Sequence, residues 1–238
     1  MTIDLNCDMG EREDIDESLL LPLITSANVS CGAHAGTPDL IKRTLRQAKH
    51  HNVTCGAHPG YPDPRNFGRL SLPLTGTEIE STLIAQLEAL SKIAAQAGVE
   101  LAHVKPHGAL YNDAAKNQLI AAAIARAVLA WNPRTILVGL AGKPVLQLWR
   151  DMGLRTAAEA FADRAYLDDG SLMPRSRPGS LLTNPEDAAA QAVQLARRGD
   201  IQTLCIHSDT PGAAAIAAAV RAHLLAESIT PATLTIPS

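Results

Sequence analysis

The chain has 238 residues, of which 46% are hydrophobic, 19% charged and only 3% aromatic, and its net charge is −3. This length is typical of one large α/β domain, so we expect residues 1–238 to form a single domain. The small net charge, without a block of like charges, argues against nucleic acid or an anionic membrane as the main partner.

The amino terminus, MTIDLNCDMGE, lacks the basic region and apolar run of a signal peptide, and no apolar stretch has the length and purity of a membrane span. The four cysteines contain no CxxC pair, which favours reduced thiols over a disulfide or a zinc knuckle. We therefore expect a cytoplasmic protein. The cysteines are Cys7, Cys31, Cys55 and Cys205.

Short β-like runs alternate with longer helical patterns along the chain. Strict alternation implies a parallel sheet with right-handed crossovers. Seven strands can close into an incomplete barrel or lie open as a doubly wound sheet, and both place the ligand at the carboxyl ends of the strands. The predicted strands are Thr2–Asn6, Ile24–Val29, Val53–Ala57, Glu100–Lys105, Arg134–Leu140, Leu154–Glu159 and Gln202–His207.

Capping residues mark the helices between these strands. Thr37 and Pro38 open the first helix, and the capping box TGTE at Thr75–Glu78 opens a second one that ends at Gly98. Later helices are predicted to open at Asp113, Lys143-Pro144, Asn184-Pro185 and Thr210-Pro211.

Two stretches nearly coincide, NVSCGAHAG at Asn28–Gly36 and NVTCGAHPG at Asn52–Gly60, with seven of nine positions identical. No third copy follows, which excludes a solenoid. We interpret the pair as two successive βα turns that aim His34 and His58 at one rim. Of the two, His58 is the better candidate for chemistry and His34 for positioning.

One segment, from Ala160 to Asn184, breaks the alternation. About 25 residues without a clear period is long for a connection inside a compact domain. We interpret residues 160–183 as an active-site loop or lid, with a disordered insertion as the alternative.

Polar and ionisable residues follow six of the seven predicted strands. Each alone has a structural explanation, and we leave His50, His51, His103 and His223 in such roles. Their shared position predicts one site at the rim of the sheet. The strand-end groups are Asn6, Asp8, Glu11, Asn28, His34, His58, Arg69, Lys105, His107, Asn112, Glu159, Asp163, Arg164, His207 and Asp209, of which Asp209 is also a candidate helix cap; the fifth strand offers mainly Lys143.

Two kinds of chemistry are compatible with these groups. A carboxylate with several imidazoles can hold a divalent metal with one position open for water, or can act as acid and base without a metal. Lys105, Arg69 and Arg164 favour an anionic ligand, either a carboxylate or a phosphate. The motif GLAGKP is not a P-loop, so a nucleotide, if used, is not bound through a Walker loop. The metal candidates are Asp8, His34, His58 and His107.

Five separated motifs, in order from Asp4 to about His207, resemble the LamB/YcsF family of bacterial 5-oxoprolinase A subunits. They are LNCDMGE, SANVSCGAHAG, GAHPGYPDPRNFGRL, HVKPHGALYN and FADRAYLDDGSL. The resemblance implies a seven-stranded parallel β/α barrel related to the sugar deacetylases. It also implies ATP-dependent opening of the 5-oxoproline lactam to L-glutamate, with Mg²⁺-bound ATP as co-substrate and separate subunits B and C as partners. Arg12, Glu13, Ala33 and Thr37 depart from the residues usual in these motifs.

We expect the strand-end residues to divide into two roles. Catalysis is assigned to Asp8, His58, Lys105 and His107. Within this set Asp8, His58 or His107 activates water, and Lys105, together with Arg69, binds the substrate carboxylate or the transferred phosphate. Substrate binding is assigned to Asn6, Asn28, His34, Arg69, Asn112, Glu159, Asp163, Arg164 and His207.

Two other functions stay open at this point. A metal-dependent amidohydrolase or sugar N-deacetylase would need a divalent ion and no ATP. A non-catalytic subunit would bind oxoproline and pass it to partners. The sequence also leaves open whether the chain forms a homo-oligomer.

Overall fold

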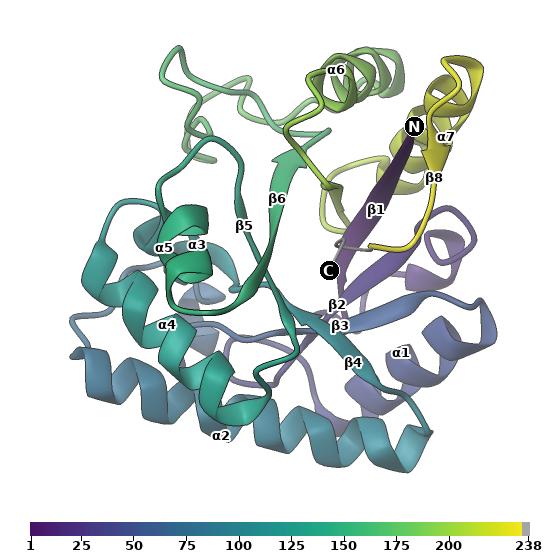
Figure 1. Ribbon diagram of the computed structural model, residues 1–238. Coiled ribbons are helices and arrows are strands. Elements are labelled where there is room, and N and C mark those ends of the chain that lie inside the picture. The colour runs from purple at the N-terminus through teal and green to yellow at the C-terminus, as the bar shows by residue number, and fades with distance from the viewer. Residues whose placement is uncertain (235–238) are drawn as a thin grey trace.

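Seven parallel strands close into a barrel in the computed structural model, which describes residues 1–234 (Figure 1). Each strand pairs with the next along the chain, and the seventh pairs back to the first. The predicted β/α barrel and all seven predicted strands are confirmed. The strands are β1 (Thr2–Met9), β2 (Ser26–Ser30), β3 (Thr54–His58), β4 (Leu101–Val104), β5 (Ile136–Leu140), β6 (Arg155–Phe161) and β7 (Thr203–His207).

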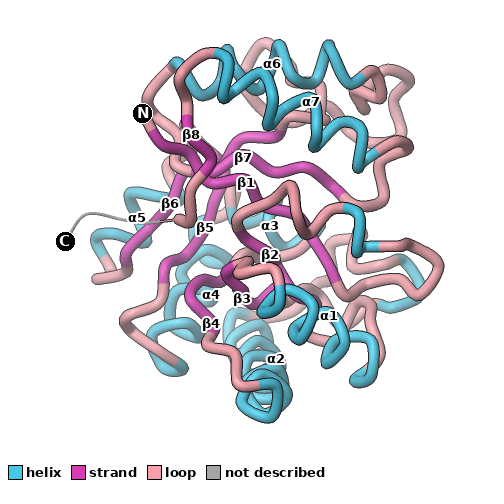
Figure 2. Tube along the Cα trace, turned by 90° about the vertical axis from the view of Figure 1, so that its right-hand side faces the viewer, coloured by secondary structure: helices cyan, strands magenta, loops and turns pink. Residues whose placement is uncertain are grey.

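Helices cover the outside of the barrel, as Figures 1 and 2 show from two directions. The pair α2 and α4 and the pair α6 and α7 pack side by side. None of the helices in residues 1–234 combines the length and apolar character of a membrane span. The helices are α1 (Pro38–His50), α2 (Gly76–Ala97), α3 (Gly108–Ala114), α4 (Gln118–Trp131), α5 (Val145–Asp151), α6 (Pro185–Arg197) and α7 (Ala213–Ala226), with 3-10 turns η1 (Glu17–Leu19) and η2 (Pro64–Asn66).

The capping predictions hold for α1, α2 and α6 but fail at Asp113. Thr75 and Glu78 form the predicted capping box. Helix α3 already begins at Gly108, so Asp113 lies in its last turn, and Asn117 caps α4 by accepting from two backbone N–H groups. The Asp113 carboxylate instead accepts hydrogen bonds from Tyr61 and Ser71, which ties α3 to the loop after β3. A smaller difference is that α7 begins at Ala213, after Gly212, rather than at Pro211.

Strand β1 explains why the inside of the barrel is polar. Its even-numbered residues Asp4, Asn6 and Asp8 alternate with hydrophobic residues, and successive side chains of a strand point to opposite faces. Asp4 accepts hydrogen bonds from Ser26 and Thr203, on the two strands adjacent to β1, at 2.5 Å each. The hydrophobic residues of β1 therefore face the helices, and the polar ones line the interior below the site.

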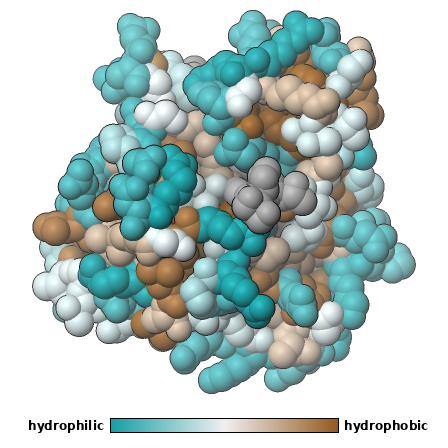
Figure 3. All heavy atoms as spheres, viewed as in Figure 1, coloured by the Kyte–Doolittle hydropathy of each residue, from teal (hydrophilic) through white to brown (hydrophobic). Residues whose placement is uncertain are grey.

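The end of the barrel where the strands begin is closed by apolar contacts. Leu234 packs with Ile136, Val138 and Ala157, and a short strand, β8 (Thr230–Pro231), pairs with the start of β1. No pattern in the sequence predicts β8. In the view of Figure 3, hydrophobic residues lie in small groups separated by hydrophilic ones. The cavity that leads to the polar centre of the barrel lies at the opposite end, where the strands finish.

The segment between β6 and α6 is held by specific contacts. Two antiparallel bridges join Arg164 to Leu181 and Tyr166 to Leu172. The Arg164 guanidinium donates to the carbonyls of Ser180 and Met173. Ala160 and Phe161, the first residues of the predicted loop, belong to β6.

Candidate active site

Four acidic and imidazole side chains converge where β1, β3 and β4 end. His58 Nε2 lies 3.3 Å from Asp8 Oδ2 and 3.8 Å from Glu11 Oε1. His107 Nδ1 lies 3.0 Å from His58 Nε2 and 3.2 Å from Glu11 Oε1. Asp8 is the penultimate residue of β1, Glu11 follows β1 after Gly10, His58 ends β3 and His107 precedes α3. Strand order thus brings His58 and His107 to Asp8 and Glu11, from which they are far apart in sequence.

Backbone carbonyls fix the tautomers of both histidines. His58 Nδ1 lies 2.7 Å from the Lys105 carbonyl, and His107 Nε2 lies 2.8 Å from the Phe67 carbonyl. Because a carbonyl only accepts, both nitrogens carry protons. In neutral rings the facing nitrogens, His58 Nε2 and His107 Nδ1, are then both lone pairs. Together with two carboxylates, they require a cation between them.

The charge balance of the cluster is reflected in its pKa values. Burial alone would raise the pKa of Asp8, but His58 and Lys105 lower it well below its usual range. Burial alone would lower the pKa of His58, but the charges of Asp8 and Glu11 raise it. Burial alone would raise the pKa of Glu11, but its contacts with His107 and His34 and the charge of His58 lower it. Both carboxylates are therefore ionised beside positive partners.

His34 supports the cluster from behind. Its Nε2 lies 3.0 Å from Glu11 Oε1, and its ring stacks on His107 with centroids 3.8 Å apart and an angle of 6°. Burial lowers the pKa of His34 to about 4, so the ring is neutral. The paired glycine-histidine motifs thus bring His34 and His58 together, with ring centroids 5.8 Å apart.

Lys105 is a buried ammonium beneath this cluster. Its Nζ lies 2.9 Å from both Asp8 Oδ1 and Glu159 Oε1, 3.2 Å from Asn6 Oδ1 and 3.1 Å from Cys205 Sγ. Burial alone would lower the pKa of Lys105, but Asp8 and Glu159 raise it well above its usual range. The ammonium therefore stays charged and holds Asp8 in place.

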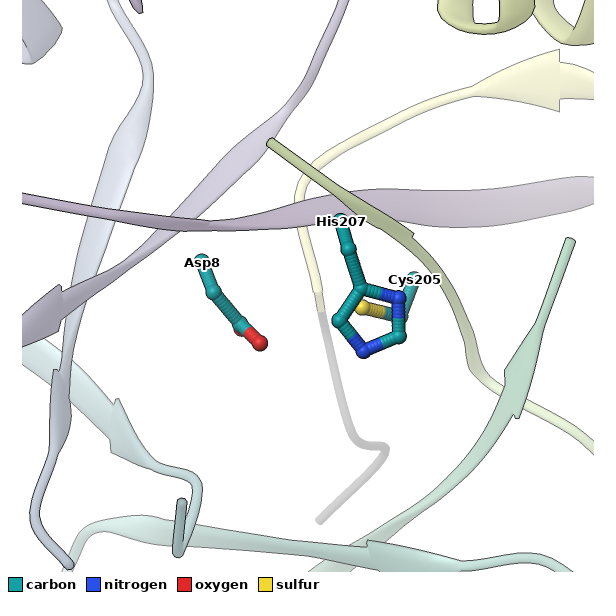
Figure 4. A group of neighbouring side chains, drawn as sticks. All are labelled: Asp8, Cys205 and His207. Atoms are coloured by element: carbon teal, nitrogen blue, oxygen red, sulfur yellow. The ribbon is translucent and has the colours of Figure 1, made fainter. Parts of the chain in front are cut away.

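A pair of a carboxylate and an imidazole lies beside this cluster, with Asp163 just after β6 and His207 at the end of β7. His207 Nδ1 is 3.0 Å from Asp163 Oδ1, and Asp163 also accepts from the His207 backbone and from Thr210. The His207 ring stacks on Phe161. Figure 4 shows the Asp8 carboxyl and the His207 imidazole reaching into the same space from β1 and β7. An imidazole oriented by a buried carboxylate is suited to moving a proton.

These groups open into a cavity of about 390 Å³, a size typical of small-molecule sites. Its mouth carries Arg69, Arg175 and Asp209. Asp209 Oδ2 lies 2.5 Å from Arg69 Nη2 and 3.1 Å from Arg175 Nη1. The mouth is thus cationic, while the floor holds the carboxylates.

The predicted site residues fall into two groups by their place in this cavity. Of those assigned to catalysis or binding, Asp8, His58, Arg69, Lys105, His107, Asn112, Arg164 and His207 line it. The others are buried around or beneath these lining residues: Asn6, Asn28, His34, Glu159 and Asp163. Lys143 lines a separate cavity.

Sequence reasoning assigns no catalytic or binding role to three residues that lie at the site. Glu11 is only one of the strand-end groups, although the motif LNCDMGE contains it. Asp209 also has the position of a helix cap. Arg175 lies in the segment without a period, which offers no signal for a single side chain.

Comparison with known proteins decides the family. The model of the LamB/YcsF family matches residues 3–237. The chain belongs to the LamB/YcsF family. A protein from Chloroflexus aggregans that is named as the A subunit of 5-oxoprolinase is 46% identical, over 97% of this chain and 98% of that protein. The LamB/YcsF assignment expected from the five motifs is thereby confirmed.

Solved structures agree with this LamB/YcsF membership. The lactam utilization protein from Thermus thermophilus superposes with a TM-score of 0.91 at 40% identity, covering 98% of this chain and 100% of that one. A family 4 carbohydrate esterase from Streptomyces lividans superposes with a TM-score of 0.55 at 11% identity, covering 98% of this chain and 93% of that one. The second likeness shows that the barrel is shared with carbohydrate esterases.

Three residue groups can be tested as ligands for a divalent metal ion. Asp8, Cys205 and His207 lie close together, but the Lys105 ammonium lies 2.9 Å from Asp8 Oδ1 and 3.1 Å from Cys205 Sγ, so it already provides the cation of this group. Glu11, His34 and His107 also lie close together. Stacked imidazoles cannot both point their in-plane lone pairs at one ion, so His34 does not fit beside His107.

The third group is the cluster of Asp8, Glu11, His58 and His107, and it fits a metal ion because His58 Nε2 and His107 Nδ1 face each other without a proton in their neutral forms. Its candidate ligand atoms are Asp8 Oδ2, Glu11 Oε1, His58 Nε2 and His107 Nδ1.

Proposed function

We propose that the chain is the A subunit of a 5-oxoprolinase, which opens the lactam ring of 5-oxo-L-proline to L-glutamate in a reaction driven by ATP. The observation that carries this proposal is the cavity that combines a cationic mouth with a floor of ionised carboxylates and imidazoles. Similarity over nearly the full length to proteins named as 5-oxoprolinase A subunits supports it.

The chemistry of a lactam explains why such a floor is useful. An amide carbon is a poor electrophile, and transfer of a phosphoryl group from ATP to the lactam oxygen makes that oxygen a leaving group. Water must then attack the ring carbon while a base accepts its proton. The ring nitrogen must gain a proton as its bond to that carbon breaks, which leaves an acyl phosphate on the opened chain. A second water then attacks this acyl phosphate, releases phosphate and completes the glutamate carboxylate.

His207 is best placed to move these protons. Its Nδ1 proton points at Asp163, which leaves the other ring nitrogen as the acceptor. Asp8, with a pKa well below its usual range, is too weak a base and instead contributes fixed negative charge beside His58. Lys105 holds Asp8 and is within reach of developing negative charge, since it also lines the cavity.

The cation between His58 and His107 is either a shared proton or a divalent metal ion. A divalent ion, when bound, would polarise the lactam oxygen as a Lewis acid. Asp8, Glu11, His58 and His107 would hold it, and these residues keep their mutual positions through His34, Lys105 and the two backbone carbonyls.

The relatives are named as one subunit of an enzyme, which implies a larger assembly. We therefore propose that the chain works with subunits B and C and that Mg²⁺-bound ATP is used within that complex. The four cysteines are free thiols, in keeping with a cytoplasmic protein.

The test is to measure glutamate formed from 5-oxo-L-proline by the complex, with and without ATP. We expect glutamate, ADP and phosphate to appear together and only with ATP. Glutamate formation without ATP, or none with ATP and all subunits present, would reject the proposal. A sugar N-deacetylase would instead release acetate from an N-acetylated sugar without ATP.

Titration of the chain with Zn²⁺ or Mn²⁺ in a calorimeter distinguishes a bound metal ion from a shared proton between His58 and His107. A bound metal ion predicts saturable binding that His58→Asn abolishes. Equal heats for both proteins would assign the site to a proton.

A further inference from the structure

Two guanidinium groups from distant parts of the chain share one carboxylate at the mouth of the cavity. Arg69 follows β3, Arg175 comes from the segment between β6 and α6, and Asp209 follows β7. Asp209 Oδ2 lies 2.5 Å from Arg69 Nη2 and 3.1 Å from Arg175 Nη1. Two positive charges facing one negative charge leave an excess of one positive charge.

The Arg69 guanidinium and the backbone of Arg175 are held in position before any ligand binds. The Arg69 guanidinium carbon lies 4.8 Å above the Phe67 ring. On the other side, Ser180 Oγ donates to the Arg175 carbonyl, and Arg164 donates to the carbonyls of Ser180 and Met173. Fixed donors lose less conformational entropy when they bind a ligand than flexible ones do.

Asp209 leaves most of the donors of the two arginines available. It accepts from Nη2 of Arg69 and from Nη1 of Arg175. Within residues 1–234, neither guanidinium makes a further side-chain hydrogen bond. Since a guanidinium carries five N–H donors, each arginine keeps donors for a planar anion.

The mouth is joined directly to the reacting floor. Phe67 accepts a hydrogen bond from His107 Nε2 at its carbonyl and carries Arg69 on its ring. In 5-oxoproline, the carboxylate and the lactam carbonyl flank the same ring nitrogen. A ring with its carbonyl at the floor therefore presents its carboxylate toward the mouth.

We propose that Arg175 and Arg69 together bind the substrate carboxylate, with Asp209 as the positioning residue that aligns them. This proposal rests on the proposed function of the same cavity. Arg175 is then the residue that makes the site select a lactam acid over a neutral lactam, and it explains why the segment after β6 lies over the cavity.

The test compares Arg175→Gln and Arg175→Lys with a matched control in the same segment. Arg177 is exposed and makes no side-chain hydrogen bond within residues 1–234, so Arg177→Gln is the control. The substrates are 5-oxo-L-proline and 5-oxoprolinamide, whose carboxylate is replaced by a neutral amide, assayed with the full complex and ATP.

We expect Arg175→Gln to raise KM for 5-oxo-L-proline about 10- to 100-fold, the usual range for a lost charge-assisted hydrogen bond, with kcat changed much less. Arg175→Lys should raise KM less, since lysine keeps the positive charge but lacks the paired N–H donors of the guanidinium. Arg177→Gln should match the wild type, and no variant should change the kinetics of the amide. Asp209→Asn should raise KM for the acid alone, by less than Arg175→Gln.

An unchanged KM for the acid in Arg175→Gln would overturn the proposal. So would an equal fall in kcat for both substrates, which would assign Arg175 to the transferred phosphate. If the complex turns over neither substrate, the proposed function fails instead. Calorimetry on the full chain then tests the binding of the carboxylate without turnover. We expect 5-oxo-L-proline to bind more tightly than 5-oxoprolinamide, and equal affinities would reject the proposal.

Discussion

Glu17 is a buried carboxylate that supports the turn carrying Glu11. Its Oε1 accepts from the Gly10 backbone N–H at 2.6 Å, and its Oε2 accepts from Thr44 Oγ1 at 2.9 Å. Burial raises the pKa of Glu17 from 4.5 to about 7. At the residue scale, the position of Glu11 in the site therefore depends on a group outside it.

Glu17 predicts a pH dependence of folding stability. Between pH 4.5 and about 7 the folded state binds its proton more tightly than the unfolded state, so the free energy of unfolding falls as pH rises. The loss amounts to about 2–3 kcal/mol by pH 8. Glu17→Gln imitates the protonated acid. In denaturant unfolding, we therefore expect the free energy of unfolding of this variant to differ less between pH 5 and pH 8 than that of the wild type. The same change in the free energy of unfolding between pH 5 and pH 8 in both proteins would contradict this assignment.

At the scale of elements, capping and alternation predicted the strands and several helix starts because both depend on residues close in sequence. The predicted helix start at Asp113 was wrong for the same reason. Asp113 resembles a helix cap in the local sequence, but its hydrogen-bond partners Tyr61 and Ser71 lie far away along the chain. Arg175 gave no signal because its segment is held by bridges and backbone carbonyls rather than by a periodic apolar face.

Strand β3 provides a prediction about packing inside the barrel. A Cβ atom at Gly56 would lie 2.2 Å from the His103 ring, whose Nε2 donates to the Asn28 side-chain oxygen at 2.7 Å. Asn28 in turn donates to Asp8. Gly56→Ala should therefore lower the free energy of unfolding by about 1–3 kcal/mol, the usual cost of overpacking, and reduce turnover.

The matched control for this change is Gly76→Ala at the start of α2, where the nearest atom to the new Cβ lies 3.5 Å away. It should be neutral or slightly stabilising in the same unfolding titrations. Equal effects of the two substitutions would show that the contact with His103 does not determine the choice of glycine.

At the scale of the whole molecule, closure of the barrel could be inferred only through the family resemblance, since seven strands also fit an open sheet. Convergence of the strand ends could be predicted in both cases, and it brought Asp8, His58 and His107 together as expected. The sequence could not separate residues that line the cavity from those beneath it, such as Asn6 and Glu159, because that depends on strand tilt and register.

The most direct test of the account is the ATP-dependent turnover of 5-oxo-L-proline by the complex carrying Glu11→Gln, beside Glu13→Gln as a control. Glu11 lies within the cluster, whereas Glu13 is exposed and pairs with Arg43 at the surface. Loss of the Glu11 charge leaves His58 and His107 without their shared carboxylate, so we predict a fall in kcat of about 100-fold or more. Glu13→Gln should keep the wild-type rate. Near wild-type turnover in Glu11→Gln would contradict the assignment of this cluster as the reacting site.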